Sequence, residues 1–86
     1  MEFEFDPKKS KSNKQKHGID FVDAQALWED PDRLEVPART QGESRSMLIG
    51  RIGQKIWSAI FTLREENTRI ESVRRSRTNE VDAYED

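Results

Sequence analysis

The sequence predicts an α+β fold, in which helices pack on an antiparallel sheet. Polar and apolar residues alternate in several short segments, as they do in half-buried strands. Two segments near the N-terminus begin at aspartate and end at glycine or proline, which is typical of helices. The chain has 86 residues, of which 33% are hydrophobic and 37% are charged. We therefore expect a single small domain over residues 1–86 with one core.

The N-terminal part predicts one strand and two helices. Residues 2–5 (Glu-Phe-Glu-Phe) alternate as a strand does. The Asp-Pro pair at 6–7 suits the start of a helix and Gly18 suits its end, so residues 7–17 are expected to be helical. Apolar residues then recur at helical spacing after Asp20, up to a second Asp-Pro pair.

The remaining elements are four strands and a final short helix. Strands are expected at residues 34–36, 45–52, 55–63 and 69–75, and the helix at 78–84. The strand at 55–63 has apolar residues on both faces, so it should be central in the sheet. The order is β-α-α-β-β-β-β-α, with two N-terminal helices packed on the sheet.

Composition excludes several kinds of site and location. The chain has no cysteine and a single histidine, so we expect no disulfide, no metal site and no cofactor. No apolar run approaches the roughly 20 residues that cross a bilayer. The N-terminus also lacks the features of a signal peptide. We expect a cytoplasmic protein that does not contact membranes.

The formal net charge is −2, yet opposite charges are separated along the chain. Residues 8–16 hold lysines and no acid. The charged residues between 20 and 35 are mostly acidic, and arginines recur from 64 to 77. A local basic face can therefore coexist with an acidic sum. The alternative for the lysines is a solvated helix face. These lysines are Lys8, Lys9, Lys11, Lys14 and Lys16.

Several segments, each unspecific alone, occur in a specific order and spacing. They are Phe3–Pro7, Asn13, Lys16–Ile19, Phe21, Ala24, Trp28, Asp30-Pro31, Gly42-Glu43, Arg45, Ile49-Gly50, Phe61–Arg64, Arg69–Arg75, Glu80 and Tyr84. In this arrangement the chain resembles the BrnT family of toxins from bacterial toxin–antitoxin pairs, over nearly its whole length.

The resemblance implies a RelE-like fold and cleavage of RNA that halts translation. It also implies neutralisation by a BrnA-like antitoxin, whose ribbon-helix-helix part binds DNA, so this chain would meet DNA only indirectly. Phe61 stands where the family usually has tyrosine, and Glu71 replaces an apolar residue. These departures leave open a second hypothesis, a non-catalytic partner of a ribbon-helix-helix protein. A third hypothesis, a plain RNA-binding module, ranks last because the sequence has no aromatic-rich strand motif of the RNA-recognition kind.

Arginine suits the phosphate of a metal-independent ribonuclease, because its fork of donors matches phosphate oxygens. The candidates are Arg64, Arg74 and Arg75. In an extended strand Arg74 and Arg75 point to opposite faces, and Glu71 shares the face of Arg75. We therefore favour Arg74 for the phosphate, because its face carries no competing carboxylate, whereas Arg75 could pair with Glu71 instead. The alternatives are an edge salt-bridge cluster, and a solvated strand end for Arg64.

His17 and Glu43 are the candidates for acid–base roles in RNA cleavage by 2′-OH attack. The alternatives are a histidine that closes the first helix and a solvated loop carboxylate. Arg45 and the lysines are expected to contact RNA phosphates in a salt-sensitive way. Glu80 and Tyr84 could line the site from the last helix, although the spacing of Tyr84 favours the core.

Overall fold

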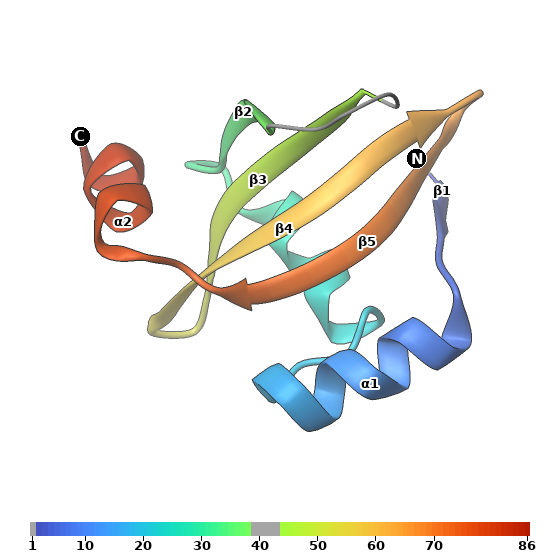
Figure 1. Cartoon of the computed structure of the whole chain (residues 1–86). Coiled ribbons are helices and arrows are strands. Elements are labelled where there is room, and N and C mark those ends of the chain that lie inside the picture. Colours follow the sequence, from blue (N-terminus) through green and yellow to red (C-terminus); the bar gives the residue numbers. More distant parts are fainter. Residues whose placement is uncertain (1, 39–43) are drawn as a thin grey trace.

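Five strands form one sheet in the order β1-β5-β4-β3-β2 (Figure 1). The structure is a computed structural model that describes residues 2–38 and 44–86. The strands are β1 (Glu2–Glu4), β2 (Leu34–Ala38), β3 (Arg45–Ile52), β4 (Lys55–Arg64) and β5 (Asn67–Arg75). The helices are α1 (Pro7–His17), the 3₁₀ helix η1 (Asp23–Glu29) and α2 (Thr78–Glu85). The α+β class is confirmed.

Two expectations about the elements are wrong. The sheet is not wholly antiparallel, because β1 pairs with β5 in parallel, with Glu2 opposite Asn67. The second helix is a 3₁₀ helix instead of an α-helix. Its tighter turn aligns residues three apart, and it thereby buries both Ala24 and Leu27 completely. Val22 occupies the N-cap position of η1, and the Asp20 carboxylate, two residues earlier, accepts a hydrogen bond from the Asp23 N–H at 2.8 Å.

Helix α1 begins and ends where the sequence predicts. The Asp6 carboxylate accepts a hydrogen bond from the Lys8 N–H at 2.8 Å. Gly18 adopts φ +84° and donates its N–H to the Lys14 carbonyl at 3.0 Å. Such a positive φ favours glycine. The helix buries no apolar side chain, so polar contacts must hold it on the sheet.

Asn13 attaches α1 to β5. Its side-chain amide donates to the carbonyl of Val73 at 2.9 Å and to that of Ile19 at 2.8 Å, and its side-chain oxygen accepts from the Val73 N–H at 3.1 Å. The side chain therefore takes the place of a neighbouring strand beyond the end of β1. Figure 1 shows the result, with α1 running below β5.

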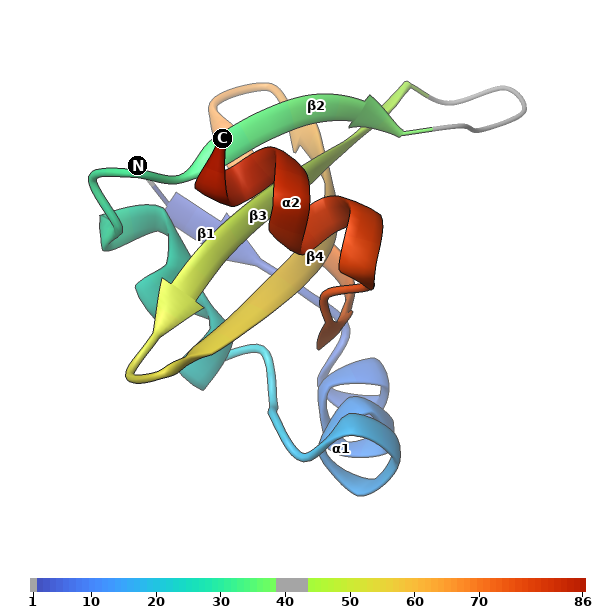
Figure 2. The same ribbon diagram turned by 90° about the vertical axis from the view of Figure 1, so that its left-hand side faces the viewer.

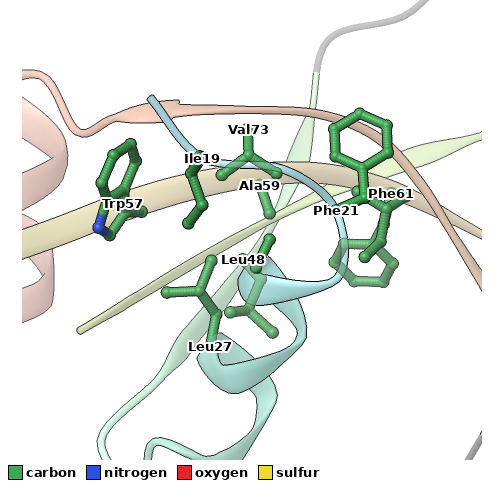
Figure 3. Packing of buried hydrophobic residues seen from close by; sticks show 10 residues of the cluster. Ile19, Phe21, Leu27, Leu48, Trp57, Ala59, Phe61 and Val73 are labelled. Atoms are coloured by element: carbon green, nitrogen blue, oxygen red, sulfur yellow. The ribbon is translucent and has the colours of Figure 1, made fainter. Parts of the chain in front are cut away.

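The core lies on one face of the sheet (Figure 3). Trp57 and Phe61 of β4 point into it, and Trp28 packs edge-to-face on Phe61 with ring centroids 5.3 Å apart. Both tryptophans therefore serve packing. β4 also buries residues of its other face and lies in the middle of the sheet, as predicted.

A β-bulge at Glu71 changes the alternation of β5. Ser72 pairs with one residue of β4 and Ile70 with the next, so Glu71 is left without a partner across the ladder. Both Ile70 and Val73 consequently face the core. Ser72 and Arg74 lie on the opposite face. Within the described residues, no helix has the length and hydrophobicity to cross a membrane.

Candidate functional site

The sheet face opposite the core carries most of the arginines of the strands. The pairing register places on it Leu34, Val36, Arg45, Met47, Ile49, Arg51, Ile56, Ser58, Ile60, Thr62, Arg64, Arg69, Ser72 and Arg74. We call this surface the open face. Helix α2 covers one end of it, and Figure 2 shows α2 lying across β3.

Arg74 is held by Glu80 of α2 in a bidentate ion pair. Its two terminal nitrogens each lie 2.8 Å from one carboxylate oxygen. The Glu80 carboxylate also accepts from the Ser58 hydroxyl at 2.8 Å and from the Arg77 N–H at 2.9 Å. The expectation that no carboxylate competes for Arg74 is therefore wrong, because the competitor arrives from a helix that the strand pattern does not include.

This pair shifts both protonation equilibria in favour of the charged forms. The hydrogen bonds from Arg74 lower the pKa of Glu80 from 4.5 to about 2, against the opposing effect of burial. The hydrogen bond to Glu80 raises the pKa of Arg74. The pair therefore stays ionised at neutral pH and fastens α2 to β4 and β5.

A second contact fastens the other end of α2. The Tyr84 hydroxyl donates to the Asp30 carboxylate at 2.6 Å, and the Arg51 guanidinium carbon lies 5.7 Å from the centre of the Tyr84 ring. The hydrogen bond to Asp30 raises the pKa of Tyr84. Burial alone would raise the pKa of Asp30, but hydrogen bonds from Tyr84 and from backbone N–H groups lower it. Tyr84 is half-buried at this contact and is not part of the core.

Arg75 lies on the core side of the sheet and not beside Glu71. Its guanidinium carbon sits 5.6 Å from the ring centre of Trp57. Glu71 pairs with Lys9 at 3.0 Å and with Arg69 at 3.4 Å. The predicted Arg75–Glu71 pair is therefore wrong, because the bulge breaks the alternation on which it rested.

A groove between α1 and β5 brings three predicted residues together. His17, Lys9 and Lys16 line one wall, and Glu71 and Ser72 line the other. The groove has a volume of about 260 Å³ and also contacts Ser12 and Asn13. Ser72 shares the open face with Arg74, two residues further, which places their Cα atoms roughly 7 Å apart. A phosphate in this groove would meet the ammonium of Lys16, the imidazole of His17 and the hydroxyl of Ser72, beside the Glu71 carboxylate that pairs with Lys9.

The other predicted residues lie elsewhere. Arg64 pairs across the ladder with Asn67, whereas Arg74 pairs with Ser58. Along β4, Arg64 is six positions from Ser58, the cross-strand neighbour of Arg74, and this is a span of roughly 20 Å. Arg45 starts β3 at the same end of the open face as Arg64. The three predicted arginines thus do not form one cluster.

The lysines of α1 are divided between its two flanks. Lys11 and Lys14 line a separate groove beside Phe5. Lys8 is exposed in the first turn of the helix. Glu43 lies outside the described residues. Among residues 2–38 and 44–86, no group of three His, Asp or Glu side chains is placed to hold a metal ion.

The sequence analysis missed Arg51, Arg69 and Ser72. Side chains alternate between the two faces of a strand. Since Leu48 is apolar and expected in the core, Arg45 and Arg51, each an odd number of residues away, fall on the opposite face. Ser72 lies two residues before Arg74 and shares its face by simple alternation, so the sequence placed it on this face without giving it a role.

Residues 5–80 match the family model described as "Ribonuclease toxin, BrnT, of type II toxin-antitoxin system". The chain belongs to the BrnT family. No curated protein matches it. As a BrnT protein it is a ribonuclease toxin of a type II toxin–antitoxin system, which implies RNA as substrate and an antitoxin as partner. The matched residues include the whole α1–β5 groove and the Arg74–Glu80 pair, whereas Tyr84 lies beyond them.

Proposed function

We propose that this BrnT protein is a metal-independent endoribonuclease that cuts RNA in the α1–β5 groove and thereby inhibits translation. A BrnA-like antitoxin neutralises it, and the chain works as a single toxin domain in the cytoplasm. The observation that carries the proposal is the groove itself, because it joins His17, Lys9 and Lys16 to Ser72 beside Arg74.

Cleavage follows from attack of the ribose 2′-oxygen on the adjacent phosphorus. An imidazole can both accept and donate a proton near neutral pH, so His17 takes the 2′-OH proton and later returns one to the leaving 5′-oxygen. The bond from phosphorus to the 5′-oxygen breaks, which leaves a 2′,3′-cyclic phosphate and a 5′-hydroxyl.

Positive charge beside His17 stabilises the pentacoordinate phosphate. The Lys16 ammonium lies in the same groove. Arg74 donates three of its five N–H groups to Glu80 and to the Arg75 carbonyl. Two donors remain for a phosphate oxygen, so the ion pair with Glu80 orients the guanidinium without using all of it.

The other predicted cations extend the contact with RNA along the backbone. Arg45 and Arg64 lie at the far end of the open face, and Lys8, Lys11 and Lys14 lie on the outer surface of α1. Exposed cations bind phosphates in a manner that salt weakens. Cleavage should therefore slow as the salt concentration rises.

The test is incubation of the purified chain with single-stranded RNA in EDTA. We expect fragments that end in 2′,3′-cyclic phosphate, and a loss of at least about 100-fold in rate for His17→Ala, as general acid–base catalysis is worth that much. Intact RNA after incubation with the wild type, or an unchanged rate for His17→Ala, would refute the mechanism. Arg74→Ala is a poor probe, because it also releases Glu80 and α2.

One observation favours a second function, a non-catalytic partner of a ribbon-helix-helix DNA-binding protein. Arg74 is already paired with Glu80, and Arg64 lies far from it. Expression of the chain without its antitoxin separates the two functions. A ribonuclease toxin arrests growth, whereas a non-catalytic partner leaves the growth rate unchanged.

A further inference from the structure

An apolar row crosses the middle of the open face. Val36, Met47 and Ile60 lie opposite one another on three adjacent strands. Each is half-buried, and none of them belongs to the core cluster or packs against it. The row continues to the exposed Ser72, which pairs with Ile60 and lines the α1–β5 groove. The side chains of Val36, Met47 and Ile60 are thus partly exposed to solvent at the centre of the sheet.

Arginines surround this row. Arg45, Arg51 and Arg64 form no ion pair with any other residue in the part of the chain that the structure describes. Glu4 and Glu71 pair with Arg69, and Glu80 pairs with Arg74. Carboxylates also lie near two of the other arginines, since Arg51 shares a pocket with Glu85 and Arg64 shares one with Glu65. Beside the row, Arg45 and Arg64 therefore carry positive charge that no ion pair among the described residues neutralises, although the chain as a whole has a net charge of −2.

The row is suited to a protein better than to RNA bases. Bases stack on aromatic rings, but the aromatic residues of β4, Trp57 and Phe61, point to the core side. Aliphatic groups favour apolar side chains, whose burial contributes about 25 cal/mol per Å². The surrounding arginines favour acidic side chains at the margins of the same contact.

We infer that the open face is the docking surface for an acidic, amphipathic segment of the antitoxin, whose apolar side chains cover Val36, Met47 and Ile60. The inference rests on the proposed function in so far as an antitoxin is the partner. Because Ser72 belongs to both the row and the groove, a segment lying on the row closes the groove. Antitoxin and RNA therefore exclude each other on this protein.

The test is titration calorimetry of the full chain with the antitoxin encoded beside it, using two matched pairs of variants. Val36→Asp and Arg45→Glu alter the open face. Leu63→Asp changes an apolar residue that is 70% exposed on the core side of the sheet, and Lys55→Glu reverses an exposed charge at the start of β4. The first two variants should weaken binding about tenfold or more, and the last two should bind as the wild type does.

Arg45 is exposed, so Arg45→Glu keeps the test valid if Val36→Asp fails to fold. Unchanged affinity of Arg45→Glu, an equal loss in Lys55→Glu, or no binding by the wild type would overturn the inference. Sedimentation of the chain alone checks for a second copy on this face, and a wild-type dimer that Val36→Asp dissolves would also overturn it. A wild type that binds through this face but cuts no RNA would refute the ribonuclease mechanism and leave the docking surface standing.

Discussion

Replacing Glu80 by glutamine should destabilise the protein mainly by releasing α2. The variant keeps the size of the side chain and one oxygen that can accept from Ser58 or from the Arg77 N–H. It loses the negative charge, however, and turns an amide N–H₂ toward Arg74. Glu80 is 6% exposed, so water replaces little of the lost interaction. Removing one partner of a buried ion pair leaves the other charge without compensation.

The pKa of Glu80 gives the magnitude. It falls from 4.5 to about 2 in the folded protein, and this difference corresponds to about 3 kcal/mol. Because the folded-state pKa is the lower one, this stabilisation is complete above pH 4.5 and disappears as the pH falls toward 2. A loss of about 3 kcal/mol at pH 7 is a large part of the 5–15 kcal/mol that stabilises a typical domain.

Urea unfolding of the wild type and of Glu80→Gln at pH 7 and at pH 3 measures this effect. The variant should be less stable at pH 7, and the difference should shrink at pH 3. Hydrogen exchange of the α2 amides reports local release of the helix, which can precede unfolding of the sheet. A free energy of unfolding within about 0.5 kcal/mol of the wild type at pH 7, the range of ordinary surface substitutions, together with unchanged α2 exchange would refute the reasoning.

Three further changes test the contacts around the sheet. Asn13→Ala should lower the free energy of unfolding in urea by about 2–4 kcal/mol, because it leaves the N–H and carbonyl of Val73 buried without partners; a loss below 1 kcal/mol would contradict that role. Gly50→Ala should lower the melting temperature at a cost of about 1–3 kcal/mol, because its Cβ would lie 3.2 Å from a carbonyl oxygen of η1; an unchanged melting temperature would contradict the close approach. Tyr84 is the single tyrosine, and its ultraviolet titration should have a midpoint above 10 that falls in Asp30→Asn; equal midpoints would show that the hydrogen bond is absent.

Local rules account for most of the elements. The Asp-Pro start and the glycine end place α1 correctly, and the apolar residues on both faces of β4 place it at the centre of the sheet. These features depend on neighbouring residues in the chain, which a sequence pattern records. The parallel pairing of β1 with β5 joins residues that lie more than 60 positions apart in the sequence. A pattern of neighbouring residues therefore cannot predict it.

The candidate site was predictable in part. The block of lysines predicted a basic face on the first helix, with His17 as an acid–base candidate at its end, and the structure places Lys9, Lys16 and His17 in one groove. On the opposite wall, simple alternation places Ser72 on the face of Arg74, whereas Glu71 lies at a bulge that the strand pattern did not reveal. The partner of Arg74 comes from a helix that starts three residues after β5 ends, so the strand pattern did not reveal it.

The most direct test of the α1–β5 groove compares Lys16→Ala with Lys11→Ala. Both substitutions remove one lysine from the same helix, but Lys16 lines the groove with His17 and Lys11 lies on the other flank. The measurement is the initial rate of RNA cleavage in EDTA at low salt. We expect Lys16→Ala to lose about tenfold in rate, a change of about 1.4 kcal/mol in the barrier. Lys11→Ala removes only a phosphate contact outside the groove, so it should lose much less. Equal rates for the two variants, or a greater loss in Lys11→Ala, would contradict the placement of the cleavage site.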